Sequence, residues 1–276
     1  MSITIEQATG RFVVAGGVSI HYGDVGSGDP VVLLHGAGPG ADAWGNFRSN
    51  VDDLAARHRL LLPDLPRFGR SEKVRTDKPR LDFLSGAIGA FLDELGIERA
   101  HFIGNSLGGQ TAMKLAIDRP DRVGRVVIVG SNAVSKSVLS PMPSEGVRHI
   151  SAYYAGDGPS IAKMRALLEV LVYDQSLVTD ALVAARYAAS IDPETVAINS
   201  EGHWPRQSIE GELSRLNAPT LIVWGQDDRA SPIDAALAML RLIPDARLHV
   251  FNRCGHWAQV ERAPAFNRLV LDFLAA

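Results

Sequence analysis

A serine flanked by glycines stands between an apolar run and a helix-forming stretch. Residues 104–108 read Gly-Asn-Ser-Leu-Gly, after the apolar run 101–103 and before the helical stretch 109–118. This G-x-S-x-G pattern is typical of a strand, a sharp turn and a helix, in which small glycines let the turn lift the serine hydroxyl off the strand. Ser106 is therefore predicted to be a nucleophile, with the N–H of Leu107 directed at a developing oxyanion. An ordinary Gly/Ser turn is the alternative.

A free serine hydroxyl is a weak nucleophile, so this hypothesis requires a histidine base and a carboxylate that orients it. Both follow in the chain order serine, acid, base that is typical of this turn. The apolar run 220–224 leads into Gly-Gln-Asp-Asp at 225–228, and the run 247–251 leads shortly to His256, the only one of eight histidines with this placement. The residues alone do not separate Asp227 from Asp228, since either could be a solvated turn residue or a helix N-cap.

A glycine-rich loop follows the first continuous apolar run. Residues 35–40 read His-Gly-Ala-Gly-Pro-Gly, after the apolar residues 31–34. The loop lacks both the lysine of a phosphate-binding P-loop and the glycine spacing of a dinucleotide site. Beside a nucleophile turn, it is interpreted as the second half of an oxyanion hole, which uses the N–H of Ala37. A tight turn without catalytic contact is the alternative.

Composition favours a protein without nucleic-acid or membrane partners. The 276 residues are 46% hydrophobic and carry a formal net charge of −3, which gives a large core and no basic surplus. No polybasic or lipidation signal, bilayer-length apolar run or secretory signal is visible. The single cysteine, Cys254, cannot form an internal disulfide and is interpreted as a packing residue. We expect a cytoplasmic protein with no metal, because no cluster has ligand spacing, and with no other cofactor.

The elements that must position these residues alternate between strands and helices. A hairpin at 11–14 and 18–25 precedes predicted strands at 31–34, 59–62, 101–103 and 125–129, with helices at 41–57, 81–95 and 109–118. This alternation predicts an α/β protein with a mostly parallel sheet flanked by helices. It breaks in the middle of the chain, where two or three helices around 160–173 and 175–190 lack strands between them. The predicted organisation is a core at 1–131, a helical lid at 132–207 after the sixth strand, and a second core part at 208–276.

Several motifs occur together in this chain: the segments 35–40, 104–109, 173–177 (Tyr-Asp-Gln-Ser-Leu), 224–229 (Trp-Gly-Gln-Asp-Asp-Arg) and 254–259 (Cys-Gly-His-Trp-Ala-Gln), and Trp44 with Asn46. Together they resemble the meta-cleavage product hydrolases, carbon–carbon bond hydrolases of aromatic degradation with the α/β-hydrolase fold. The resemblance is to 2-hydroxy-6-oxo-6-phenylhexa-2,4-dienoate hydrolases in particular. It selects Asp228 as the acid, because these enzymes place it three residues after the turn glycine and four before the proline.

The resemblance implies hydrolysis of a 2-hydroxy-6-oxohexa-2,4-dienoate to 2-hydroxypenta-2,4-dienoate and a carboxylic acid. Arg186 matches a lid arginine that would hold the C1 carboxylate and 2-oxo group and favour the keto tautomer. Asn46 and Asn105 match residues that bind this same end, and Trp257 would wall the polar pocket. Ser106 would then attack the C6 carbonyl. The resemblance also implies a homo-oligomer, a dimer or a higher assembly.

Each of these residues has a structural alternative. Arg186 could be a surface charge, Asn105 could shape the turn, Asn46 could cap its helix, and Trp257 could be core packing. Leu171 stands at a position of the expected lid where the resembling enzymes can have an aromatic residue. The smaller leucine would leave more room for the substituent on C6, and an aryl group is our first choice. Arg67 stands where glycine is frequent in these enzymes, and we assign it no role.

Two other functional classes remain open at this stage. A general carboxylesterase would share the serine, acid and base without needing Arg186, and a ligand receptor on the same fold would bind without turnover.

Overall fold

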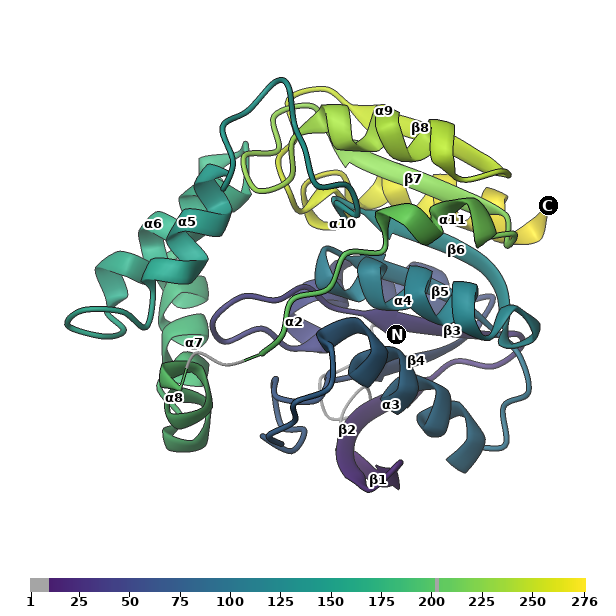
Figure 1. Ribbon diagram of the computed structural model, residues 1–276, viewed down its shortest axis with the longest axis horizontal. Coiled ribbons are helices and arrows are strands. Elements are labelled where there is room, and N and C mark those ends of the chain that lie inside the picture. Colours follow the sequence, from purple (N-terminus) through teal and green to yellow (C-terminus); the bar gives the residue numbers. More distant parts are fainter. Residues whose placement is uncertain (1–9, 202–203) are drawn as a thin grey trace.

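The computed structural model describes residues 10–201 and 204–276, and its strands form one sheet. The eight strands lie in the order β1-β2-β4-β3-β5-β6-β7-β8 (Figure 1). Their bounds are β1 Arg11–Ala15, β2 Val18–Val25, β3 Pro30–Leu34, β4 Arg59–Pro63, β5 Ala100–Asn105, β6 Val123–Val129, β7 Thr220–Gly225 and β8 Ala246–Phe251. β1 and β2 are antiparallel to their neighbours, whereas β4, β3, β5, β6, β7 and β8 run parallel. The predicted mostly parallel sheet is thereby confirmed.

The central strands are buried on both faces, which explains their continuous apolar sequences. The side chains at 31–34 in β3 and 220–225 in β7 are buried, whereas the edge strand β8 alternates partly buried and exposed positions. Because parallel strands carry their carboxyl ends to one edge of the sheet, the loops after β3, β5, β7 and β8 meet there. These are the loops that carry the predicted catalytic residues.

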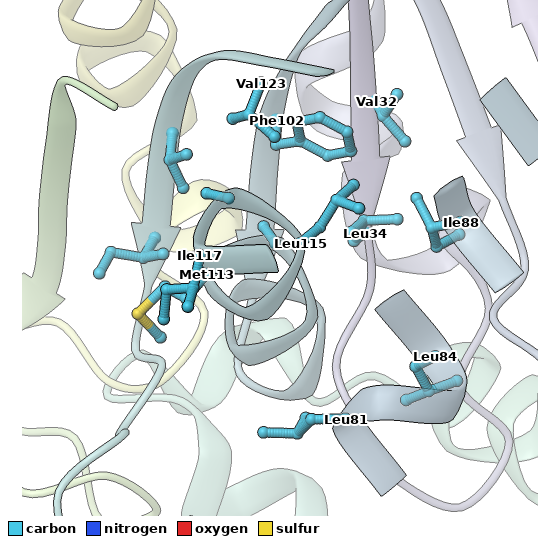
Figure 2. Packing of buried hydrophobic residues seen from close by; sticks show 14 of the residues in the cluster. Val32, Leu34, Leu81, Leu84, Ile88, Phe102, Met113, Leu115, Ile117 and Val123 are labelled. Atoms are coloured by element: carbon cyan, nitrogen blue, oxygen red, sulfur yellow. The ribbon is translucent and has the colours of Figure 1, made fainter. Parts of the chain in front are cut away.

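Helices cover both faces of the sheet. On one face lie α3 Arg80–Glu94, α4 Leu107–Asp118 and α9 Ile233–Leu242, and on the other lie α2 Ala43–Ala55, α10 Ala258–Glu261 and α11 Ala263–Ala275. Figure 2 shows the first face, where Leu115 of α4 packs near Phe102 of β5 and Leu34 of β3. Short 3₁₀ helices occur at Pro120–Arg122, Gln175–Leu177 and Glu210–Arg215. Gly96, with φ of 65°, ends the turn after α3.

The predicted helix at 109–118 starts two residues earlier than expected. α4 begins at Leu107, directly after Ser106. The nucleophile turn therefore has no spacer between the serine and the first helical N–H groups. This places the unpaired N–H groups of the first helical turn beside the serine.

Between β6 and β7 the described residues form four helices, of which α6 packs against both α5 and α7. They are α5 Glu145–Ala152, α6 Ile161–Leu171, α7 Asp180–Ser190 and α8 Pro193–Ser200, and in Figure 1 they stand beyond the carboxyl ends of the parallel strands. The expected helix at 175–190 is interrupted, because Thr179 accepts a hydrogen bond from the N–H of Leu182 and starts α7 anew. Asp192 caps α8 in the same way.

Some sequence predictions fall outside the described residues. The interpretation of residues 1–9 as lacking a secretory signal is one of them. Residues 202 and 203, inside the expected lid segment, also lie outside the described ranges.

Candidate active site

Ser106 occupies the turn between β5 and α4 in a conformation that few residues adopt. Its φ is 52° and its ψ is −115°, and its N–H donates to the carbonyl of Val129 at 2.9 Å. A Cβ at Gly104 would lie 2.4 Å from the N of Gly109, and one at Gly108 would lie 2.0 Å from the carbonyl oxygen of Leu34. The two glycines of the motif are thus required by close backbone approaches. The strain at Ser106 is of the kind that clusters at functional sites.

Asp228 and His256 are brought together by the loops after β7 and β8. Oδ2 of Asp228 lies 2.8 Å from Nδ1 of His256, and both residues are buried. Oδ1 of Asp228 accepts from the N–H groups of Ala230 and Ser231 at 2.8 Å each. Asp227 is exposed. The fixed carboxylate is placed to accept a hydrogen bond from Nδ1–H of His256, which is the arrangement of an acid that orients a histidine base.

The loops that carry the serine and the histidine are in direct contact. The side-chain amide of Asn105 donates to the carbonyls of Val129 at 3.0 Å and His256 at 3.4 Å. Gly130, which the sequence analysis did not single out, has φ of 56°, and a Cβ there would lie 2.9 Å from Nδ1 of His256. The sequence signal that could have identified Gly130 is its position directly after the apolar run 125–129. A glycine is therefore needed for the acid and base to approach the end of β6.

The glycine-rich loop after β3 lies against the nucleophile. A Cβ at Gly36 would lie 3.0 Å from Oδ1 of Asn105 and 3.2 Å from Cβ of Ser106. His35 holds this loop: its Nε2 accepts from the N–H of Leu65 at 2.9 Å, and its Nδ1 lies 2.9 Å from the carbonyl of Gly36. Burial lowers the pKa of His35, so the ring is neutral and acts as a fixed bridge. The loop that carries Ala37 thereby lies beside the turn that carries Ser106.

Arg186 of α7 is a buried cation without a carboxylate partner. It is 7% exposed, and among the described residues its guanidinium makes no ion pair and its Nε has no hydrogen-bond partner. Burial lowers its pKa, although Asp42 opposes this shift from a distance. A Cβ at Gly38 would lie 2.9 Å from Nη2 of Arg186, so the guanidinium reaches the glycine-rich loop. An unpaired buried charge is costly unless a ligand completes it.

Trp257, directly after His256, and Arg186 of α7 lie close together. The guanidinium carbon of Arg186 stands 5.6 Å from the ring centre of Trp257. Trp257 also belongs to an apolar cluster with residues of α6 and α7, including Leu171. The N–H of His256 donates to the carbonyl of Leu171 at 2.8 Å. The end of α6 therefore helps to hold the histidine loop.

The two asparagines predicted to bind substrate differ in what they leave open. Oδ1 of Asn105 accepts from Nδ2 of Asn46 at 3.3 Å, so both ends of the Asn105 amide are engaged within the chain. Oδ1 of Asn46 is buried and has no partner among the described residues. Asn46 is thus able to accept a hydrogen bond from a ligand, whereas Asn105 orients Asn46 and joins the serine loop to the histidine loop.

A cavity of about 690 Å³ opens between the core and α7 and α8. Ala37, Leu107 and Arg186 line it, while the lining residues do not include Ser106, His256 or Trp257. Leu171 belongs to the apolar cluster that contains Trp257 and does not line this cavity. Further lining residues that sequence reasoning did not assign to the site are Arg67, Arg80, Tyr154 and Trp204. These four residues are far apart in the sequence and belong to no motif. The only signal was Arg67, which stands where glycine is frequent in the resembling enzymes.

Comparison with known proteins agrees with this arrangement. Residues 29–263 match the family model described as alpha/beta hydrolase fold. The chain is 42% identical to the 2-hydroxy-6-oxo-6-phenylhexa-2,4-dienoate hydrolase of Burkholderia cepacia over 98% of both proteins. It is 43% identical to a 2-hydroxy-6-oxononadienedioate/2-hydroxy-6-oxononatrienedioate hydrolase of Cupriavidus pinatubonensis, over 98% of this chain and 96% of the relative. The chain belongs to the meta-cleavage product hydrolases.

A solved structure of this hydrolase family has the same fold. The meta-cleavage product hydrolase from Pseudomonas fluorescens IP01 superposes with a TM-score of 0.86 at 36% identity, covering 97% of this chain and 98% of that one. The predicted α/β-hydrolase fold and family are therefore confirmed. In the described part of this meta-cleavage product hydrolase, no helix is both long and apolar enough to cross a membrane.

Proposed function

We propose that this chain hydrolyses the C5–C6 bond of 2-hydroxy-6-oxo-6-arylhexa-2,4-dienoates, giving 2-hydroxypenta-2,4-dienoate and an aromatic acid. The observation that carries the proposal is Arg186, a buried guanidinium with no anionic partner among the described residues. A planar guanidinium binds a carboxylate through two parallel hydrogen bonds. The C1 carboxylate of the dienoate supplies the charge that the site lacks.

Arg186 also accounts for the first chemical step that the substrate requires. Carbon is a poor leaving group, so the dienol must become a ketone before the bond to C6 can break. A proton moves from the 2-hydroxyl to C5, and the guanidinium stabilises the resulting 2-oxo group beside the carboxylate. Asn46, whose Oδ1 has no partner among the described residues, and Trp257, 5.6 Å from the guanidinium of Arg186, are proposed to bind this same end of the dienoate.

Cleavage follows through an acyl-enzyme. Oγ of Ser106 attacks the C6 carbonyl while Nε2 of His256 takes its proton, and Asp228 stabilises the imidazolium that forms. The N–H groups of Ala37 and Leu107 bind the oxyanion. The C5–C6 bond breaks, its electron pair enters the dienolate, and His256 returns the proton to this leaving group. Water, activated by His256, then releases the acid and restores Ser106.

The assignment of an aryl group on C6 rests on a relative and on the composition of the site. The Burkholderia cepacia relative is named for the 6-phenyl compound. The cavity contains the aromatic residues Phe68, Tyr154 and Trp204, which suit an aromatic substituent. We also propose that residues 132–207 act as the lid of a core formed by 1–131 and 208–276. The enzyme is further proposed to be cytoplasmic, with no nucleic-acid or membrane partner, no cofactor, and a homo-oligomeric state of two or more copies.

The test compares two substrate classes on one enzyme. Purified protein is mixed with 2-hydroxy-6-oxo-6-phenylhexa-2,4-dienoate and, separately, with an aryl ester, and kcat/KM is measured for each. A carbon–carbon hydrolase converts the dienoate to benzoate with the higher kcat/KM. Faster cleavage of the ester identifies a carboxylesterase instead. Binding of the dienoate without turnover of either compound identifies a receptor.

A further inference from the structure

The cavity that Arg186 lines also has the cationic side chains of Arg67 and Arg80 in its wall, together with Trp204. Arg67 is 7% exposed, and its guanidinium carbon stands 4.2 Å from the ring centre of Trp204. Its Nη2 donates to the carbonyl of Ile198 at 3.1 Å. Its φ of 79° is a conformation that favours glycine, at a cost of about 1 kcal/mol for other residues. A strained and buried arginine at this position calls for a reason beyond packing.

The carboxylates of the cavity do not neutralise these arginines. The acidic lining residues are already engaged by backbone N–H groups: Asp42 with Gly45, Asp64 with Ala43 and Arg70, and Asp192 with Thr195. Glu201, the acidic residue that acts on Arg67, is bound through both oxygens by Arg75. Neither Arg67 nor Arg80 forms an ion pair within the described ranges.

Arg80 is a second cation with unused hydrogen-bonding capacity. Its Nε is buried and has no partner among residues 10–201 and 204–276. Burial, with the neighbouring charges of Arg206 and Arg67, lowers its pKa to about 10. Arg80 also begins α3, where a positive charge opposes the helix dipole. Both arginines would therefore be stabilised by an anion in the cavity.

We propose that Arg67, Arg80 and Trp204 form a second carboxylate subsite in the same cavity as the oxyanion loop. A pair of guanidinium groups favours a carboxylate, and the ring of Trp204, with Phe68 6.5 Å away and Phe83 6.4 Å away between ring centres, favours an aromatic one. Ala37 and Leu107 line the same cavity, so one ligand volume joins the two regions.

The carboxylate has two possible sources. It is either borne on the C6 substituent of the substrate or is the carboxylate of the released acid. The assignment to substrate or product rests on the proposed function, whereas the binding of an aromatic carboxylate does not.

The test measures selectivity and binding separately. Wild type, Arg67→Gly, Arg67→Lys and Arg80→Gln are assayed with the 6-phenyl dienoate and with its 6-(carboxyphenyl) analogue, and benzoate binding is measured by calorimetry. In Arg67→Gly the cation is removed and the backbone strain at φ of 79° is relieved, so we expect the variant to fold. In Arg67→Lys the positive charge is kept. Arg268→Gln is the matched control, because Arg268 is exposed, does not line the cavity and is not among the charges that act on Arg67 or Arg80.

If the carboxylate belongs to the substrate, wild type should have a higher kcat/KM for the carboxyphenyl compound than for the phenyl compound. The ratio of kcat/KM for the carboxyphenyl compound to kcat/KM for the phenyl compound should fall about tenfold or more in Arg67→Gly and Arg80→Gln. It should fall less in Arg67→Lys and stay unchanged in Arg268→Gln. An unchanged ratio with benzoate binding weakened about tenfold or more assigns the subsite to the released acid. Unchanged ratio and unchanged benzoate binding in folded variants overturn the subsite. If wild type converts neither dienoate, the proposed function fails, while benzoate binding still decides the subsite.

Discussion

Replacing Arg186 by methionine should raise stability and abolish most activity. Arg186 is 7% exposed and its guanidinium has no ion pair among the described residues, so the folded protein bears the cost of burying its charge. Methionine matches the length of the stem and removes that cost. We expect the free energy of unfolding to rise by about 1–3 kcal/mol, after allowance for the lost contact with Trp257. Thermal denaturation should show this as a Tm increase of about 2 °C or more per kcal/mol.

The activity should change in the opposite direction. Without the guanidinium, the C1 carboxylate enters the site unpaired, which costs about 2–5 kcal/mol. The value of kcat/KM for the phenyl dienoate should therefore fall by about 30- to 4,000-fold. The keto tautomer should also form more slowly, which stopped-flow absorbance of the dienolate measures.

A matched substitution in α6 shows whether the loss of activity is specific to Arg186 or follows from the loss of any positive charge in the helices between β6 and β7. Arg165 of α6 is partly exposed and ion-paired with Asp180, so Arg165→Met should change kcat/KM by less than about threefold. The reasoning is refuted if Arg186→Met lowers Tm by several degrees while kcat/KM stays near that of wild type. That result would make Arg186 a structural residue.

Three further predictions follow from other parts of the site and core. Gly130→Ala should lower kcat by about tenfold or more with a fold retained by circular dichroism, because its Cβ would stand 2.9 Å from Nδ1 of His256; an unchanged kcat would show that the loop yields freely. For Asp64, burial alone would raise the pKa, but hydrogen bonds from His21, Ala43 and Arg70 hold the pKa below its ordinary value. Its contribution to stability is therefore present above pH about 4 and is lost as pH falls through the folded pKa. Asp64→Asn should lower Tm at pH 7 and flatten the decline of Tm below pH about 4, and an equally steep decline in the variant would contradict this. Burial raises the pKa of the Cys254 thiol to about 12, so a disulfide reagent at pH 8 should label it only after denaturant is added, and rapid labelling of the native protein would show an open thiol.

The sequence predicted the parts of the molecule that depend on local chemistry. The turn at Ser106 needs glycines for close backbone approaches, and the strand-ending loops must carry Asp228 and His256 to one edge of a parallel sheet. These requirements produce short sequence patterns, namely glycines around Ser106 and polar loops directly after apolar runs. The start of the expected helix at 175–190 was less visible, because Thr179 caps α7 through a single hydrogen bond and the helix begins only at Asp180.

The cavity wall could not be predicted in the same way. Arg67 follows β4, Arg80 begins α3 and Trp204 follows α8, so their association is set by tertiary packing alone. The engagement of Asn105 was also hidden, since its amide contacts Asn46, Val129 and His256, which are distant in the sequence. Spacing indicates which residues share a loop or helix face, but it does not indicate which buried groups are left without a partner.

The most direct test of the account is a single turnover of the phenyl dienoate by wild type and Ser106→Ala, with benzoate quantified after rapid quenching. The account predicts one benzoate per active site for wild type. The variant should still bind the dienoate and perturb its dienolate absorbance through Arg186, but should form benzoate more than about a thousandfold more slowly. Formation of benzoate by Ser106→Ala at close to the wild-type rate would contradict the nucleophilic role of Ser106 and the mechanism built on it.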